Sequence, residues 1–575
     1  MTASSPPTSR PQCGTVAGYP AGTVLRGVPV VAGVQYAPVI RPGRLPVVDA
    51  GASEAVIDDA DRPAEAARFG AAASAVATRL RDRAAHATGA ASEVLAATAA
   101  LAQDRAWLGA AEKRIKDGTP AVTAVGAAVE QFVDMFTQLG GLMAERVTDL
   151  RDIRDRVIAE LSGLPEPGVP LPDIPSILCA EDLAPADTAG LDPNLVVALA
   201  TTLGGPTSHT AIIARQLGIP CVVAVEGLDA VAAGTMVLVD GTLGTVTVAP
   251  DHAAAGEAVA AAQREAERAA HWSGPGATAD GHAVSILANV QDGAAARSAS
   301  ETPAEGVGLF RTELCFLNRD TEPSVEEQAD IYTEVLEAFS GRKVVIRTLD
   351  AGSDKPLKFV GHPDEANPAL GVRGIRIAEG NPGLLDRQLQ AIAAAAQRTG
   401  NQPWVMAPMI ATAQEAERFA AQTRSHGLTA GVMIEVPAAA LLADRILEHV
   451  DFLSIGTNDL AQYTMAADRM SADLATLTDP WQPAVLTLVA MAVRAGAAAG
   501  KPVGVCGEAA ADPLLACVLT GLGVTSLSGA AAAIQGVGAK LAQVSIQQCR
   551  DAGDAVLGTA SAADSRAAAL SALGN

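Results

Sequence analysis

Residues 204–215, GGPTSHTAIIAR, combine a glycine turn, a single histidine and the start of an apolar helix. The glycines permit close backbone approach, and the hydroxyl of either Thr207 or Ser208 is suited to cap the helix. Because the first N–H groups of a helix attract anions, a phosphoryl group on His209 would lie in a favourable field. An isolated histidine at a helix start is more often a cap or a surface residue, but this context favours a phosphohistidine.

A second set of polar residues directly follows apolar runs in the C-terminal half of the chain. Its members are Arg311, Thr312 and Glu313; Arg347 and Asp350; Asn458 and Asp459; Glu435; and Cys506 with Glu508. Each alone has a structural explanation, as an ion pair at a rim or, for Glu435, as a helix cap. Independent rim residues have no reason to converge at one place, so the set favours a binding site.

The residue types in this set suit a ligand that carries both a phosphate and a carboxylate group. The planar fork of arginine binds such oxygens through paired hydrogen bonds. Two carboxylates on neighbouring strands, Glu435 and Asp459, can hold Mg²⁺ while water and ligand oxygens complete the octahedron. We therefore expect a Mg²⁺-dependent site for a doubly anionic ligand.

These residues require a scaffold that brings the ends of several strands together. Strands alternating with helices over about 300 residues indicate a (β/α)8 barrel, whose active sites lie at the carboxyl ends of the strands. The eight expected strands are residues 284–290, 306–310, 344–348, 404–408, 431–435, 452–455, 503–506 and 524–528.

The N-terminal half is expected to hold a β/α unit around His209, interrupted by four or five alanine-rich antiparallel helices. Glycine and proline at residues 274–276 indicate a joint that is either a functional swivel or a plain linker. The expected parts are a disordered extension (1–24), the phosphohistidine β/α domain (25–62 and 165–250), the helical insertion (63–164), a linker helix and hinge (251–279), the barrel (280–547) and a tail (548–575) that is helical or disordered.

The chain has 575 residues and a formal net charge of -23, which argues against nucleic acid or an anionic membrane as its main partner. No apolar run long enough for a secretory signal or a membrane span occurs. The seven cysteines are scattered and include no CxxC pair, as is typical of reduced thiols. We therefore expect a cytoplasmic protein.

Four motifs resemble, in order and spacing, enzyme I of the phosphoenolpyruvate:sugar phosphotransferase system. They are GVGLFRTE (306–313), NPALGVR (367–373), MIEVPAA (433–439) and IGTNDLAQYT (455–464). The segment around His209 resembles the phosphohistidine signature of the same family, and ERVTDLRD (145–152) resembles its helical part. The resemblance covers about residues 25–545 and implies a swivelling phosphohistidine domain with an inserted helical bundle, followed by a TIM-type barrel.

By this resemblance, phosphoenolpyruvate phosphorylates His209, which then phosphorylates a histidine of the phosphocarrier protein HPr, and pyruvate is released. The implied ligand residues are Arg311, Arg347 and Arg469 for phosphate and carboxylate oxygens, Asn458 and Asp459 for the ligand, Arg373 and Lys355 as support for the phosphate, and Glu435 with Asp459 for Mg²⁺. Cys506 matches the family's proton donor, whereas the commoner use of a cysteine is as a small buried residue. The family also implies HPr docking on the helical insertion and a homodimer through the barrel.

Two other functions are open to a chain of this kind. A dikinase or synthase would charge the histidine from a nucleotide, but no glycine-rich phosphate loop precedes the His209 unit. A regulatory homologue would be expected to lose His209, Arg311, Glu435 or Cys506, and all four are present. The chain departs from the family pattern at Val31-Ala32, Pro206 and Thr525-Ser526, which leaves open whether the acceptor is the sugar-system carrier or a regulatory paralogue.

Overall fold

The computed structural model describes residues 19–43, 56–86, 90–139, 146–164, 167–169, 172–183, 191–205, 208–317, 319–352, 355–361, 364–469, 471 and 474–574. The chain divides into two units, Met1–Ala262 and Gln263–Asn575. Residues 1–18 of the expected extension lie outside the described residues, and a strand begins within its last part.

The first unit contains an eight-stranded sheet in the order β1-β8-β7-β3-β4-β5-β6-β2. Its centre is parallel from β3 to β6, and each of the remaining strands pairs antiparallel with its neighbour. The strands are β1 (Thr23–Arg26), β2 (Val28–Val31), β3 (Val34–Ile40), β4 (Ser176–Ala180), β5 (Val196–Thr201), β6 (Cys221–Val223), β7 (Met236–Asp240) and β8 (Thr245–Val248). The sheet thus combines strands from before and after the helical insertion, as the expected domain bounds 25–62 and 165–250 require.

Both faces of the central strands are buried, because successive side chains of a strand point to opposite faces. Ile177 and Ala198 belong to one apolar cluster, and their neighbours Leu178 and Leu199 belong to another that includes Ala214 of α8 (His209–Leu217). One face of the sheet therefore packs against α8.

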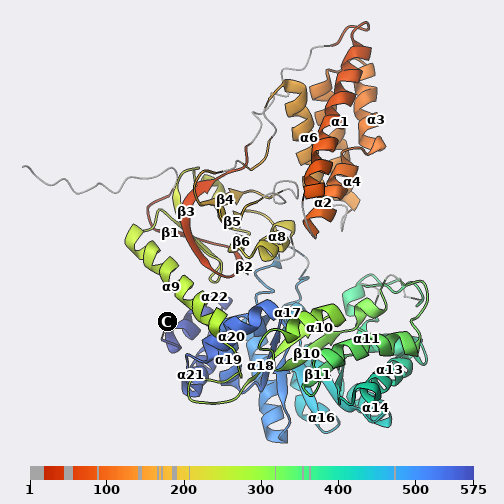
Figure 1. Cartoon of the computed structure of the whole chain (residues 1–575), viewed down its shortest axis with the longest axis vertical. Helices are drawn as coiled ribbons and strands as arrows, with labels where there is room; N and C mark the ends of the chain where they lie inside the picture. The colour runs from red at the N-terminus through yellow and green to blue at the C-terminus, as the bar shows by residue number, and fades with distance from the viewer. Residues whose placement is uncertain are drawn as a thin grey trace, which may run out of the picture. The chain divides into compact units, whose positions relative to one another are not determined.

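A bundle of helices interrupts the sheet between β3 and β4, as the sequence predicts (Figure 1). Its described helices are α1 (Arg62–His86), α2 (Ala90–Leu101), α3 (Arg105–Lys116), α4 (Ala121–Leu139) and α6 (Val147–Ser162). Its core is built around Phe69, Trp107 and Ile115, and the indole of Trp107 donates a hydrogen bond to the carbonyl of Leu101.

The helix α9 (His252–His271) follows the sheet and carries mostly exposed side chains, as its composition predicts. The boundary between the two units falls within it, ahead of the glycine- and proline-containing joint. Gly276 of this joint belongs to the second unit, where its N–H and that of Ile286 both donate to Oε1 of Glu305, at 3.0 and 2.9 Å.

The second unit is a closed barrel of eight parallel strands (Figure 1). The strands are β9 (Ser285–Val290), β10 (Gly306–Arg311), β11 (Lys343–Arg347), β12 (Trp404–Ala407), β13 (Thr429–Ile434), β14 (Phe452–Ile455), β15 (Val503–Val505) and β16 (Ser526–Gly529). Each coincides within a few residues with a strand expected from the sequence.

Helices cover the outside of the barrel. They are α10 (Gly293–Ser300), α11 (Val325–Ala338), α12 (Ile377–Gly380), α13 (Leu384–Thr399), α14 (Ala413–Ser425), α15 (Pro437–Leu441), α16 (Ala443–Leu447), α17 (Thr457–Met465), α18 (Pro483–Ala499), α19 (Pro513–Leu522), α20 (Ile534–Leu541), α21 (Ile546–Leu557) and α22 (Ala562–Ala572). Local signals set several of their starts: the Ser324 and Thr412 hydroxyls cap α11 and α14, each with a glutamate completing a capping box. No helix among the described residues is long and apolar enough to cross a membrane.

Candidate active site

A cavity of about 240 Å³ opens at the carboxyl ends of the barrel strands. It is lined by residues that follow six different strands, as the sequence predicts for functional side chains of this fold. Eight of the predicted site residues line it: Arg311, Arg347, Lys355, Glu435, Asn458, Asp459, Arg469 and Cys506.

Arg347, the last residue of β11, forms two buried ion pairs in the wall of this cavity. One guanidinium nitrogen pairs with Glu313, and another lies 3.0 Å from Asp350. Burial alone would lower the pKa of Arg347, but the carboxylates of Glu313 and Asp350 outweigh it, so the pKa is raised. Arg347 therefore forms the ion pairs that a residue at the barrel rim could form. These pairs lie inside the cavity, where they fix the direction of the guanidinium group.

Arg373 is 2% exposed and lies behind the cavity wall rather than in it. Its Nη2 is 3.4 Å from both oxygens of Asp350, and its Nη1 is 3.6 Å from Oδ1 of Asp459. Nη1 also donates to the hydroxyl of Tyr463, at 3.2 Å. Arg373 thus links the carboxylates of two different strands and positions them.

Glu435 and Asp459 each present a carboxylate oxygen with unused hydrogen-bonding capacity. Oε1 of Glu435 accepts a 2.6 Å hydrogen bond from the backbone N–H of Met409, which has a left-handed φ of 60°. Oε2 of Glu435 and Oδ1 of Asp459 are buried and accept no hydrogen bond from any described residue, although the Asp459 oxygen has Nη1 of Arg373 at 3.6 Å. Burial, together with the charges of Asp350 and Asp459, raises the pKa of Glu435 to about 8. Two unsatisfied acidic oxygens in one cavity fit a hard divalent cation.

Cys506 follows β15 and lies in the floor of the cavity with 2% of its surface exposed. Burial raises the pKa of its thiol, while the Ser454 side chain acts in the opposite direction. The thiol donates to the carbonyl of Ile455 at 3.5 Å. The side-chain amide of Asn289 donates to the Cys506 carbonyl at 3.0 Å, which holds the backbone in place. The thiol therefore keeps its proton near neutral pH, as an acid catalyst must.

The remaining cavity residues supply positive charge and a polar amide. Arg311 is exposed at the end of β10, and Lys355 and Arg469 are partly buried. Oδ1 of Asn458 accepts from the N–H of Glu508, at 3.0 Å, so that its amide nitrogen remains for a ligand. This end of the barrel offers three cations to an anionic ligand besides the paired Arg347.

His209 lies in the first unit, at the first position of α8. Ser208 caps this helix by accepting from the N–H of Ala211 at 3.3 Å, and Gly204 has a left-handed φ of 95°. The side chain of His209, and the whole of Pro206 and Thr207, lie outside the described residues. The backbone nevertheless has the turn and the capped helix start that the sequence predicts.

Three supporting residues were not predicted from the sequence, because their roles depend on partners far away in the chain. Gln388 of α13 connects the backbone N–H of Leu349 with the hydroxyls of Thr312 and Tyr332, at 3.0 to 3.1 Å. Tyr463 and Asn289 support Arg373 and Cys506, respectively. The only local signal was a polar residue at a buried helix or strand position.

Comparisons with known proteins agree with this architecture. Residues 26–146, 172–244 and 265–546 match three PEP-utilising enzyme families, described as N-terminal, mobile domain and PEP-binding domain. Over 555 residues the chain is 49% identical to the phosphoenolpyruvate-protein phosphotransferase of Streptomyces coelicolor, which covers 96% of this chain and 99% of that protein.

Two further relatives are more distant. A multiphosphoryl transfer protein of Rhodobacter capsulatus is 44% identical over 452 residues, which are 76% of this chain and 54% of that protein. A phosphoenolpyruvate-protein phosphotransferase of Haloferax volcanii is 42% identical over 466 residues, 77% of this chain and 80% of that protein. Since the first relative matches along nearly the whole of both chains, this protein belongs to the phosphoenolpyruvate-protein phosphotransferase family, the enzyme I family that its motifs resemble.

Proposed function

We propose that this enzyme transfers the phosphoryl group of phosphoenolpyruvate to His209 and then to a histidine of HPr, with release of pyruvate. The observation that carries the proposal is the convergence, in one cavity, of guanidinium groups, unsatisfied carboxylate oxygens and a buried thiol. Each of these groups answers one chemical demand of the reaction.

The first demand is to bind a small ligand with two anionic ends. Arg311, Lys355 and Arg469 supply charge for the phosphate and carboxylate oxygens of phosphoenolpyruvate. Arg347 is already oriented by Glu313 and Asp350, so that little rotamer freedom is lost when it meets the ligand. The amide of Asn458 completes the polar contacts.

The second demand is to offset the charge on the phosphoryl group during transfer. Glu435 and Asp459 would hold Mg²⁺ through their unsatisfied oxygens, and the bound ion would supply positive charge to the phosphate oxygens. Arg373 limits the mutual repulsion of the acidic side chains from behind, since it lies close to both Asp350 and Asp459.

In the proposed transfer, a ring nitrogen of His209 attacks phosphorus in line and the bond from phosphorus to the enol oxygen breaks. The thiol of Cys506 then donates its proton to the methylene carbon of the enolate, which gives pyruvate. The dipole of α8 favours the phosphoryl group on its first residue. Protonation of the carbon gives the keto form and so draws the transfer forward.

The second transfer requires His209 to reach a partner as well as the barrel. We assign HPr docking to the helical bundle α1 to α6 and the relative motion to the segment that joins the two units. We also propose a homodimer through the barrel, whose surface exposes Leu441, Leu442 and Met491.

The test uses phosphoenolpyruvate labelled in its phosphate, with Mg²⁺, on the wild-type protein and on His209→Ala. An exposed histidine provides a matched control in His282→Ala. Acid-labile label is expected on the wild type and the control but not on His209→Ala, and the label is expected to move to added HPr.

The other outcomes separate the alternatives. Label that stays on His209 in the presence of HPr would keep the phosphohistidine and reject HPr as the acceptor. Binding of phosphoenolpyruvate without any label would reject the enzyme and favour a regulatory role.

A further inference from the structure

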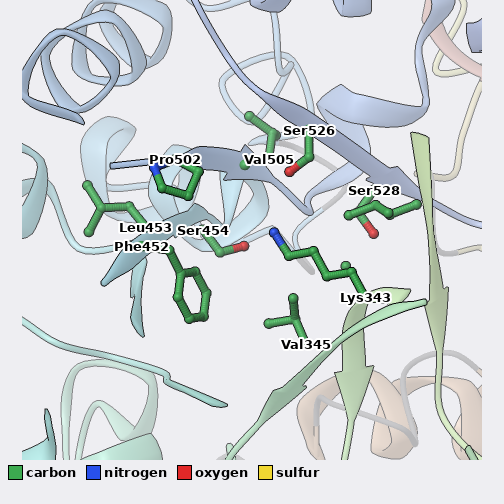
Figure 2. Close-up of a pocket in the computed structure, with 12 residues that line it drawn as sticks. Lys343, Val345, Phe452, Leu453, Ser454, Pro502, Val505, Ser526 and Ser528 are labelled. Carbon is green, nitrogen blue, oxygen red and sulfur yellow. The ribbon is translucent and has the colours of Figure 1, made fainter. Parts of the chain in front are cut away.

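The barrel contains a second, smaller cavity near the amino-terminal ends of its strands, away from the candidate active site. It measures about 20 Å³ and is lined by side chains of β11, β14 and β16, among them Lys343, Ser454, Ser526 and Ser528. Figure 2 shows the Lys343 amine directed into the space between these serines. A polar cavity of this size has room for one water molecule.

Two glycines keep this cavity open. A Cβ atom on Gly308 would lie 2.4 Å from Oγ of Ser528, and one on Gly504 would lie 2.5 Å from Oγ of Ser526. Both distances are shorter than real Cβ contacts, so alanine at either position would displace a serine hydroxyl. At this level the interior of the barrel therefore has three serine hydroxyls among its apolar side chains, whereas barrels of this kind are usually filled with apolar side chains alone.

Lys343 is an unusual residue for this position. Its Nζ lies 3.8 Å from the ring centre of Trp404 and 5.9 Å from that of Phe452. No described carboxylate offsets its burial, which lowers the pKa of Lys343 to about 8. The amine therefore exchanges protons readily near neutral pH, and Lys343 as a whole residue is partly exposed at the amino-terminal end of the barrel.

Ser454 lies between this amine and the active-site thiol. Along β14, Phe452 and Ser454 point into the barrel, and Ser454 pairs in register with Gly504, two residues before Cys506. The Ser454 side chain acts on the Cys506 thiol by lowering its pKa, while the thiol itself donates to the carbonyl of Ile455 at 3.5 Å. Cys506 also packs in one interior cluster with Phe452. Figure 2 shows the Ser454 hydroxyl on the side of the Lys343 amine, and the register of β14 with β15 places Ser454 beside the strand that leads to Cys506.

We infer that Lys343, one water molecule in this cavity and Ser454 form a path that returns a proton to Cys506 after its thiol has protonated the product. The inference rests on the proposed role of Cys506 as the acid. The thiol is 2% exposed, and its open side faces the cavity that the substrate fills. Protons that reach it during turnover would therefore come from the opposite end of the barrel.

The proton transfers balance without any further reactant. The Ser454 hydroxyl gives its proton to the thiolate, so that an O–H bond breaks and an S–H bond forms. The water molecule reprotonates the Ser454 oxygen and takes a proton from the ammonium group of Lys343. The neutral amine then recovers a proton from solvent at the amino-terminal end of the barrel.

Hydrogen exchange of the pyruvate methyl group in D₂O measures this path directly. By microscopic reversibility, the thiolate of Cys506 removes a methyl proton from pyruvate, and deuterium enters only if the thiol exchanges its proton before returning it. The exchange is followed by proton NMR with Mg²⁺ and pyruvate. Phosphorylation of His209 by one equivalent of phosphoenolpyruvate is measured in parallel, because it does not require a reloaded thiol.

Lys343→Met and Ser454→Ala are expected to slow methyl exchange about tenfold or more while the phosphorylation of His209 remains. Ser454→Thr, which keeps the hydroxyl, is expected to restore exchange. Ser526→Ala is the matched control, since it removes a hydroxyl from the same cavity that does not contact the thiol. Lys343→Arg keeps the positive charge but not the ability to release a proton, so it should resemble Lys343→Met.

Three results would contradict the inference, each in a different way. Wild-type exchange in Lys343→Met and Ser454→Ala, together with its loss in Cys506→Ala, would mean that the thiol is reloaded from elsewhere. Wild-type exchange in Cys506→Ala would remove the acid role itself and with it that part of the proposed function. A loss of exchange in Ser526→Ala equal to that in Ser454→Ala would indicate disturbed packing in place of a defined path.

Discussion

Replacing Lys343 with methionine is expected to stabilise the barrel unit near neutral pH. Burial lowers the pKa of Lys343 to about 8 in the folded protein, against about 10.4 in an unfolded chain. A difference of about 2.4 units corresponds to about 3 kcal/mol at about 1.4 kcal/mol per unit. Methionine removes this penalty but also the attraction of the ammonium group to Trp404, worth about 1 to 2 kcal/mol. The net gain is therefore about 1 to 2 kcal/mol.

The pH dependence of this gain follows from the direction of the shift. Below about pH 8 the folded protein holds the charged amine, and the full penalty is present. Between about pH 8 and pH 10.4 the unfolded chain binds the proton that the folded chain has lost, so the wild-type stability rises with pH. The advantage of Lys343→Met over the wild type should therefore fade across this interval.

Differential scanning calorimetry of the full chain measures the effect on the barrel transition, with an expected rise in Tm of about 2 to 5 °C near pH 7. Lys358→Met is the matched control, because this lysine is on the surface and its ion pair with Asp320 is exposed. A variant that is less stable than the wild type near pH 7, or a gain that does not change with pH, would refute the reasoning.

Three further predictions concern the candidate site. Cys506→Ala should leave the phosphorylation of His209 detectable but slow pyruvate formation about a hundredfold, measured by chemical quench; unchanged turnover would remove the thiol from the mechanism. Mg²⁺ should raise the Tm of the wild type but not that of Glu435→Gln, with the exposed Glu448→Gln as control; an equal rise in both variants would reject Glu435 as a ligand. Ser208→Ala should destabilise the start of α8 by about 1 kcal/mol and speed amide exchange there, and unaltered exchange would show that the cap contributes little.

Much of the fold and of the candidate site was predictable because the signals are local. Apolar runs bounded by turn residues predict the barrel strands, and the polar residue after each run is carried to the same end of the barrel by the parallel arrangement. The start of α8 is set by Ser208 and the preceding glycines within a few residues. By contrast, β1, β5 and β8 were not predicted individually, since short apolar or threonine-rich runs do not distinguish a strand from other buried segments.

The sequence by itself determined which residues stand at the ends of the strands and at the start of α8, because spacing along the chain fixes the periodicity of an element. Only the tertiary structure decided their electrostatic state. It paired Arg347 with Glu313, set Arg373 between two carboxylates, and enclosed Lys343 with aromatic rings and serines. These partners lie tens to hundreds of residues apart, and the energy of a charge depends on burial and on neighbours in space, which no local pattern encodes.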